Sequence, residues 1–375
     1  MRSSISNSDV HLTRRWLPGG SWFVPCLMGL LVAAAAVAGL EVVLASRGYV
    51  PTIVDSPAVW ARERSRVGEL GARAIVLVGA SRMQLDVDLP TLRQLTGKEP
   101  VQLAIDGGSF VPVLADLAAD ESVKGTVLVD YYDDAVGELA TGGGVQLELA
   151  EWTTRRSRSA QFNFSASEEW LAGIVRRYLR SYADGASPFD SVTLRALEPK
   201  ATPQYLVTLP SRERKADYRK VDMPAFYYKR VARNLGLVPP VPGLAWTQVD
   251  QTLRRAVADL PVAALPLFGT GAQAIAGMVR RIEARGGRVI FVAMPTSGLV
   301  RDIDERKFPR SLYWDRFSAM VPTWSVRSSD VPALARFVCP DGSHLDMRDQ
   351  LDFTRALVRA LPKDNLNETG SGKAL

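Results

Sequence analysis

The sequence predicts an α/β protein with a doubly wound parallel sheet, a large helical insertion and one N-terminal transmembrane helix. Three observations support this fold class. A 24-residue apolar stretch, residues 22–45, stands near the N-terminus. Beyond it, short apolar runs rich in β-branched residues each end in Gly, Ser, Asp or Pro, as buried parallel strands do. Helical segments separate these runs, and strands that alternate with helices favour a parallel sheet.

The apolar stretch is the candidate membrane anchor, because it exceeds the roughly 20 residues that cross a hydrocarbon core. The preceding tail, residues 1–21, carries Arg14 and Arg15, which favour a cytoplasmic N-terminus. A cleaved secretory signal is the alternative, since small residues at 34–38 could form a cleavage site. Both interpretations export residues 46–375. We therefore expect a single-pass protein of the cell inner membrane whose folded part is periplasmic or otherwise extracytoplasmic.

The sheet is expected in two parts, residues 71–137 and 263–362. Residues 46–70 precede the first part and are expected to be a linker that ends in a short polar helix. Functional side chains should follow the carboxyl ends of the strands, which meet at one edge of such a sheet. The expected strands are 74–78, 101–105, 126–129 and 289–293, and the main expected helices are 113–119, 272–285 and 348–361.

Residues 138–262, which separate the two parts, are rich in arginine and aromatic residues and are expected to form a cap over the active edge of the sheet. Basic residues in this insertion would suit a polyanionic glycan, and a solvated helical face is the alternative. Aromatic residues among basic ones also suit single-stranded nucleic acid, but export argues against that partner. The polar tail 363–375 is expected to be disordered.

The composition limits the chemistry. The net charge is +6, with 46 basic and 40 acidic residues. Cys26 lies in the apolar stretch and Cys339 near the C-terminus, so a disulfide between them is not expected. Paired His/Cys spacings typical of metal sites are absent from the sequence, and it carries no cofactor signature. The chain has two histidines, His11 and His344, and only His344 is in the exported part.

Ser81 is the candidate nucleophile. It follows the buried run 74–78 in the order Gly-Ala-Ser-Arg, which places its hydroxyl at the carboxyl end of a strand. A serine needs a base to remove its proton, and His344 is the only histidine available for that role. Asp341 precedes His344 by three residues and could orient the imidazole. Taken separately, a helix-capping serine and a turn with a capping aspartate are the alternatives.

Together, these two elements resemble the SGNH (GDSL-like) hydrolase superfamily, which has a flavodoxin-like sheet. That resemblance covers residues 71–135 and 265–362 and implies a catalytic triad of Ser81, Asp341 and His344. It also implies an oxyanion hole built from the N–H groups of Ser81 and Gly107, together with an asparagine side chain. The third strand is instead followed by Asp-Tyr-Tyr-Asp-Asp at 130–134, so this sequence departs from the family at the asparagine. Three alternatives follow: Tyr131 or Tyr132 replaces it, the hole has two donors, or activity is weakened.

The resemblance implies ester chemistry, and no metal or cofactor. The expected function is O-acetyl transfer to, or deacetylation of, an exported or cell-envelope polysaccharide, with a membrane protein as a candidate acyl donor. The alternative is a catalytically degenerate, membrane-tethered binding or scaffold subunit of a polysaccharide assembly complex. Five residues near the strand ends are further candidates for substrate contact: Arg82, Gly108, Tyr132, Thr296 and Ser297.

Overall fold

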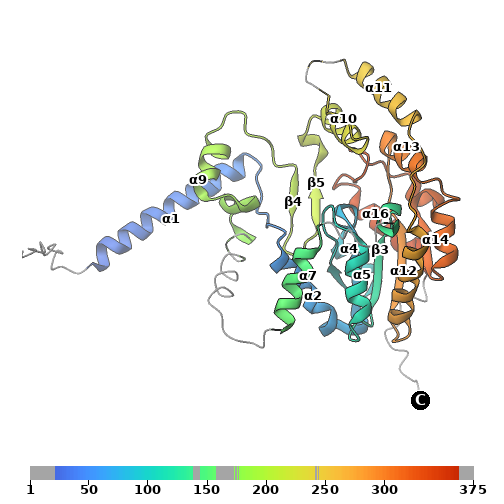
Figure 1. Ribbon diagram of the computed structural model, residues 1–375. Helices are drawn as coiled ribbons and strands as arrows, with labels where there is room; N and C mark the ends of the chain where they lie inside the picture. The colour runs from blue at the N-terminus through green and yellow to red at the C-terminus, as the bar shows by residue number, and fades with distance from the viewer. Residues whose placement is uncertain are drawn as a thin grey trace, which may run out of the picture.

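The computed structural model describes residues 22–137, 144–157, 177–240 and 245–362, with the single positions 173, 175 and 243. The tails expected at 1–21 and 363–375 lie outside these residues. Helix α1 (Phe23–Ser46) extends away from the folded part as a separate rod (Figure 1). Among the described residues it is the one helix long and apolar enough to cross a bilayer, and almost none of it is buried.

Five parallel strands form the central sheet, in the order β2-β1-β3-β6-β7. Every residue of the two central strands β1 and β3 is buried, as expected for strands covered on both faces. The direction of winding reverses between β1 and β3, and ligands of such sheets bind at the carboxyl ends beside this reversal. The strands are β1 (Ala74–Val78), β2 (Glu99–Gln102), β3 (Thr126–Asp130), β6 (Arg288–Ala293) and β7 (Trp324–Arg327).

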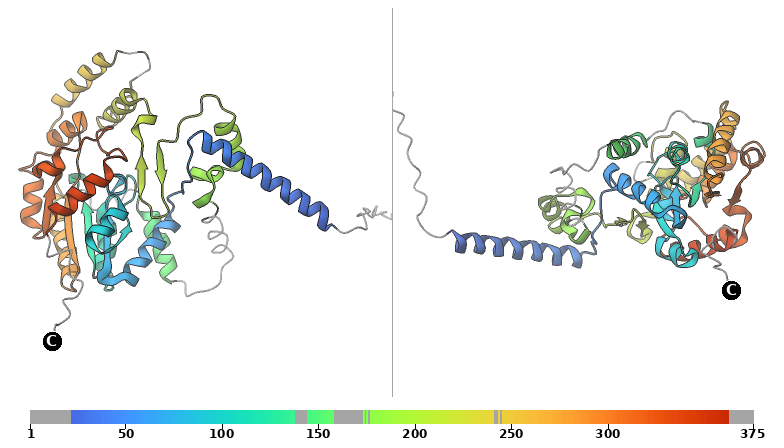
Figure 2. Two further views of the ribbon diagram at one scale, coloured as in Figure 1. Left: turned by 180° about the vertical axis from the view of Figure 1, so that it is seen from behind. Right: turned by 90° about the horizontal axis from the view of Figure 1, so that it is seen from below.

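Helices cover both faces of the sheet, which confirms the α/β class (Figure 2). Because side chains alternate along a strand, Val76 packs under one layer and Leu77 under the other. One layer contains α2 (Pro57–Leu70), α5 (Phe110–Ala119), α12 (Phe268–Glu283) and α14 (Trp314–Met320). The other contains α4 (Leu89–Thr96), α15 (Pro332–Ala335) and α16 (Gln350–Ala360).

The second strand ends earlier than the expected range 101–105. Strand β2 stops at Gln102, although the following residues continue to run along β1. The N–H groups of Leu103 and Ile105 donate to the carbonyls of Leu77 and Gly79, at 2.8 and 3.0 Å. The apolar run is therefore shared between the strand and an extended loop.

The short helix expected at the end of residues 46–70 is present as α2, but it packs in the core of the protein and is not part of a linker. Ser56 caps α2, and Trp60 and Val67 of this helix belong to the main core. The charged sequence concealed this packing because Arg64, which is fully buried, pairs with Asp116 and Asp120 of the neighbouring segment at 2.6 and 2.9 Å.

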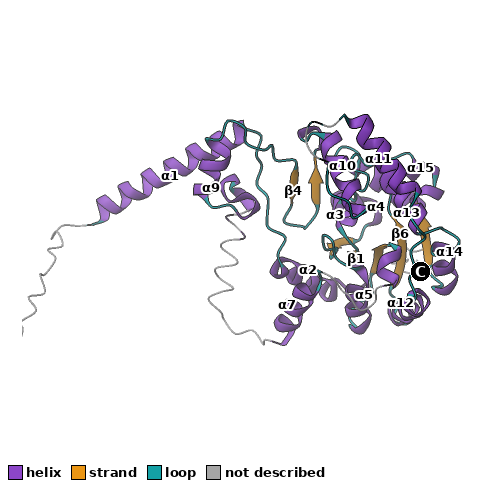
Figure 3. Ribbon diagram, turned by 45° about the horizontal axis from the view of Figure 1, so that its top comes forward, coloured by secondary structure: helices purple, strands orange, loops and turns teal. Residues whose placement is uncertain are grey.

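The sequence predicts a single cap over the active edge, but the described residues of the insertion pack in four separate places (Figure 3). Helix α7 packs on α2, and a second group of short helices contacts α1. A hairpin lies beside α3 (Ser81–Leu85), while α10 and α11 pack on α13 (Gly298–Lys307). Its elements are α7 (Gln146–Ser157), η2 (Arg180–Gly185), α9 (Pro188–Ser191), η3 (Val192–Ala196), β4 (Leu206–Thr208), β5 (Arg214–Ala216), η4 (Tyr218–Lys220), α10 (Met223–Asn234) and α11 (Trp246–Ala258). Three short elements complete the described fold: η1 (Gly71–Arg73), α6 (Asp133–Gly137) and η5 (Ser328–Asp330).

Candidate active site

Ser81 is the first residue of α3, directly after the turn that ends β1. Gly79 in this turn has φ +147°, a conformation that side chains with a Cβ rarely adopt. A Cβ on Gly79 would lie 2.5 Å from the Cβ of Asp130 at the end of β3. Only glycine therefore lets the ends of β1 and β3 approach so closely, and this approach positions Ser81 at the edge of the sheet.

Ser81, His344 and Asp341 form a continuous hydrogen-bonded relay. The Oγ atom of Ser81 lies 2.8 Å from Nε2 of His344, and Nδ1 of His344 lies 2.8 Å from Oδ2 of Asp341. Asp341 is fully buried and His344 is 4% exposed. The structure thus brings together the three residues that the sequence singled out.

The loop that carries His344 is held at both ends by buried carboxylates. Asp341 Oδ1 accepts hydrogen bonds from the backbone N–H groups of Ser343 and His344, at 2.9 and 2.8 Å. Asp86, at the end of α3, accepts one from the N–H of Leu345 at 2.9 Å. Since α3 also begins with Ser81, both Ser81 and the loop that carries His344 are fixed to the same short helix.

Asp341 is poised to remain ionised. Burial alone would raise its pKa, but the hydrogen bond and charge of His344, the charge of Arg230 and the backbone donors lower it to about 2. An ionised carboxylate at Oδ2 accepts the proton of Nδ1, which leaves Nε2 free to accept the proton of Ser81.

Arg230, in the insertion, is a member of the site that the sequence did not indicate. Its Nη2 atom lies 3.1 Å from Asp341 Oδ2. One turn earlier on α10, the Tyr227 hydroxyl accepts a hydrogen bond from the N–H of Leu299 at 2.7 Å, which fixes α10 to the start of α13. The insertion therefore supplies a cation to the relay.

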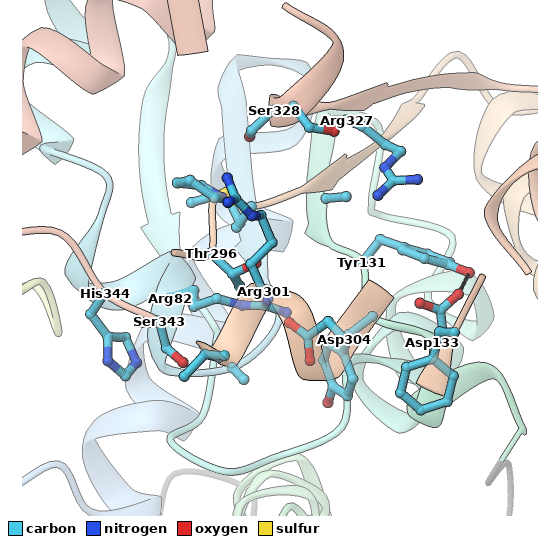
Figure 4. A pocket seen from close by; sticks show the side chains of 18 of the residues that line it. Arg82, Tyr131, Asp133, Thr296, Arg301, Asp304, Arg327, Ser328, Ser343 and His344 are labelled. Carbon is cyan, nitrogen blue, oxygen red and sulfur yellow. Dashed lines mark hydrogen bonds between the residues drawn. The ribbon is translucent and has the colours of Figure 1, made fainter. Parts of the chain in front are cut away.

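The relay opens into a pocket of about 480 Å³ (Figure 4). Most of the residues expected to contact substrate line it: Ser81, Arg82, Gly107, Gly108, Tyr132, Thr296 and His344. Ser297 is placed differently. Its Oγ atom accepts a hydrogen bond from the N–H of Cys339, and its own N–H donates to the carbonyl of Gly342, both at 2.9 Å. Ser297 therefore holds the loop that contains Asp341.

Neither tyrosine offers a free hydroxyl for the place that an asparagine holds in the family that the sequence resembles. Tyr131 donates to Asp133 Oδ1 and Tyr132 donates to the carbonyl of Gly108, both at 2.6 Å. Gly107 also lines the pocket, and its φ of +66° is in the left-handed region that glycine tolerates.

A cation instead lies next to Ser81 in the sequence and in the same pocket. Arg82 pairs with the fully buried Asp130, with Nη2–Oδ1 and Nε–Oδ2 distances of 3.1 and 3.3 Å, and packs 5.7 Å from the ring centre of Tyr132. Burial would lower the pKa of Arg82, but the charges of Asp130 and Asp304 outweigh it and raise that pKa. Figure 4 shows the Arg82 side chain between His344 and Asp304.

The part of the pocket away from Ser81 is strongly charged. Burial raises the pKa of both Asp133 and Asp304 to about 6, against the opposing influence of nearby arginines and, for Asp133, of the Tyr131 hydroxyl. Arg301 and Arg327 line the same pocket. Within the part of the chain that the structure describes, no cluster of three His, Cys, Asp or Glu side chains could hold a metal ion.

Asp130, Asp304 and Arg230 were not among the residues that the sequence indicated as functional. Asp130 directly follows a predicted strand, and this position at a strand's carboxyl end could have indicated a functional residue. Asp304 lies in the charged run Arg-Asp-Ile-Asp-Glu-Arg, which has the appearance of a solvated helix.

No family model, curated protein or solved structure matches this chain.

Proposed function

We propose that the protein is a membrane-anchored serine esterase or O-acyltransferase that acts on a carbohydrate polymer outside the cytoplasm. The observation that carries the proposal is the Ser81–His344–Asp341 relay, with two successive distances of 2.8 Å, at the mouth of a pocket. Those distances are within the range in which a base can accept the proton of a nucleophile.

In the proposed reaction, Ser81 Oγ attacks the ester carbonyl carbon while His344 Nε2 takes the Ser81 proton. The tetrahedral intermediate then collapses, and His344 returns the proton to the departing alcohol oxygen. The acyl group stays on Ser81 as an ester. Water or a sugar hydroxyl then attacks this ester, with His344 again as the base, and Ser81 recovers its proton. The same relay serves hydrolysis and transfer.

Arg82 is our candidate for the missing oxyanion donor, beside the N–H groups of Ser81 and Gly107. Its guanidinium has five N–H donors, and Asp130 holds it by only two contacts. A fixed cation in a site with little water stabilises a developing oxyanion strongly. Arg82 would therefore do the work of the asparagine in the related family.

The lining of the pocket supports a carbohydrate substrate. Carboxylates such as Asp304 accept hydrogen bonds from hydroxyl groups, and arginines such as Arg301 donate to ring and hydroxyl oxygens. A volume of about 480 Å³ accommodates a small acylated sugar unit. The exposed apolar helix α1 supports membrane anchoring, and the arginines before it support an exported catalytic part.

The test is hydrolysis of a chromogenic acetyl ester by the purified full-length protein, compared with Ser81→Ala. Ser343→Ala is the matched control, because Ser343 lines the same pocket beside His344. We expect Ser81→Ala to abolish turnover above background and Ser343→Ala to retain it. Equal rates for wild type and Ser81→Ala would remove Ser81 as the nucleophile. Mass spectrometry of the products formed in the presence of an oligosaccharide acceptor then distinguishes transfer from hydrolysis.

A second candidate function is a catalytically degenerate binding subunit of a polysaccharide assembly complex. The hydrogen bonds of Tyr131 and Tyr132 favour it. Both hydroxyls donate to other acceptors, so the oxyanion hole lacks the usual side-chain donor. This function predicts that an acidic or neutral oligosaccharide binds equally well to wild type and to Ser81→Ala, with no acyl-enzyme formed by either.

A further inference from the structure

Part of the insertion is bound to the end of the membrane-length helix. Glu41, within α1, accepts hydrogen bonds from the backbone N–H groups of Arg180 and Ser181, at 2.9 Å each. Arg47, directly after α1, donates to the carbonyls of Arg195 and Glu198 at 3.0 and 2.9 Å. These contacts fix η2 and η3 to the last part of α1, and Figures 1 and 2 show α9 alongside it.

This bound segment presents large apolar side chains to its surroundings. Phe189, Leu194 and Leu197 are 74%, 64% and 68% exposed. The inner face of the same segment is polar: the Ser191 hydroxyl donates to the carbonyl of Ser181, and Arg195 packs 5.3 Å from the ring centre of Tyr49. The segment is therefore amphipathic, and its apolar face has no partner among the described residues. We call Phe189, Leu194 and Leu197 the apolar platform.

The length of α1 sets the height of the platform relative to a bilayer. Its 24 residues span about 36 Å, whereas a hydrocarbon core is about 30 Å thick. If Phe23 marks one boundary, the other falls about 20 residues later, near Val42. Glu41 is therefore at the level of the far boundary, where an ionisable side chain is tolerated. Because Glu41 binds η2 directly, the segment that follows η2 stands at the headgroup layer.

From this we infer that the apolar platform rests in the outer interfacial layer of the same bilayer that α1 spans. The occupant of the exposed face is lipid, because the platform continues the apolar surface of α1 at the height of the boundary. An amphipathic segment that inserts shallowly, with its polar face toward the protein, is an established mode of membrane contact. The platform and α1 would give the catalytic part a fixed orientation over the membrane, where a single helix would leave it free to swivel. The inference depends on the anchoring role of α1 and is independent of the ester chemistry.

The experiment uses the full-length protein in lipid nanodiscs. In a Cys26→Ala background, single cysteines are introduced by Phe189→Cys and Leu197→Cys and labelled with an environment-sensitive fluorophore. Leu31→Cys, 56% exposed on α1, is the positive control, and Val238→Cys, 87% exposed between α10 and α11, is the matched water-exposed control. Cys339 is buried and should not react. The measurement is emission wavelength and quenching, by lipids with a spin label near the headgroup for positions 189, 197 and 238, and by lipids with a spin label deep in the acyl chain for position 31, which lies about 12 Å from Phe23 along α1.

We expect the labels at 189 and 197 to be blue-shifted and quenched by the headgroup spin label at least twofold more than the label at 238, and the label at 31 to be blue-shifted and quenched by the acyl-chain spin label. If the label at 31 is quenched while those at 189 and 197 behave as the label at 238, the platform stands clear of the lipid and the inference is wrong. If the label at 31 is also unquenched, α1 does not span the bilayer, and the inference again fails. Chromogenic-ester turnover in the same nanodiscs is a separate readout, so its loss or retention bears on the proposed function alone.

Discussion

The Asp341→Asn substitution should change Nε2 of His344 from a base that accepts the Ser81 proton into a hydrogen-bond donor. Asp341 Oδ1 accepts two backbone N–H groups, from Ser343 and His344. An asparagine would keep its oxygen there, since turning it would place an N–H₂ group against two donors. Its amide nitrogen would then face Nδ1 of His344 and Nη2 of Arg230. Nδ1 would have to accept a hydrogen bond from this amide, so the ring hydrogen would be on Nε2, where it faces Ser81.

The expected loss of kcat is about 10⁴, the value found when a relay of this type is held in the wrong tautomer. Stability changes as well. The folded-state pKa of Asp341 is lowered from 3.8 to about 2, so its ionised form adds about 2 kcal/mol to the free energy of unfolding, at 1.36 kcal/mol per pKa unit. For a lowered pKa this contribution is complete above about pH 4. It is lost as the pH falls toward 2.

The assay is kcat on a chromogenic acetyl ester, with urea unfolding of the same samples. The control is the double variant Asp341→Asn with Arg230→Gln, which removes the donor facing the new amide. If the loss came from repulsion of Arg230, the double variant would recover activity, whereas the tautomer explanation predicts no recovery. Wild-type kcat in Asp341→Asn, within about tenfold, would refute this reasoning, because the rate would then not depend on the tautomer.

Three further predictions follow from the charged groups of the pocket. Arg230→Gln should lower kcat by less than about tenfold, with KM unchanged, and should move the acidic limb of the pH–rate profile to higher pH, because a positive charge near the relay is removed. Arg230→Lys should restore both kcat and the profile. An unshifted profile for Arg230→Gln would argue against this positioning role. Asp304→Asn should raise the free energy of unfolding by about 3 kcal/mol at pH 7.5 and by less than about 1 kcal/mol at pH 4. The reason is that the pKa of Asp304 is raised from 3.8 to about 6, so wild-type stability is lost as the pH rises through that window. Equal effects at both pH values in urea melts would contradict this prediction. Arg82→Met leaves Asp130 buried without its ion-pair partner and should cost about 3–5 kcal/mol at pH 7.5. The cost should become smaller as the pH is lowered, because burial raises the pKa of Asp130 and a protonated side chain needs no ion-pair partner. A cost independent of pH would show that packing dominates.

The strands and the relay could be predicted from sequence because their signals are local. Strands such as β1 and β3 are buried on both faces, so each is a continuous apolar run. His344 is the one histidine that follows the apolar stretch, and its position after a turn left little choice of base. Ser81 followed from its place at a strand end, and the carboxyl ends of parallel strands meet.

The rest depends on contacts between segments far apart in the sequence. Edge strand β7 has alternating Trp, Ser, Val and Arg, and only Val326 is buried, so it lacks the apolar run of a central strand. The contact of Arg230 with Asp341 depends on how α10 docks on α13, which no spacing in the sequence specifies. The packing of α2 was missed because Arg64 is buried by its ion pairs.

The insertion was misread for a similar reason. Its arginines and aromatic residues indicated one cap, but its elements pack against four separate parts of the protein. The contact with Glu41 of α1 could not be foreseen, because Glu41 offered only a charge near the end of an apolar stretch.

The most direct measurement of the central claim is the mass of the intact full-length protein after treatment with a fluorophosphonate, which reacts with activated serines. If His344 activates Ser81, the wild type should gain the mass of one probe, located at Ser81 by peptide mapping, and His344→Ala and Ser81→Ala should gain none. An unlabelled wild type, or equal labelling of the wild type and Ser81→Ala, would contradict the assignment of Ser81 as the nucleophile.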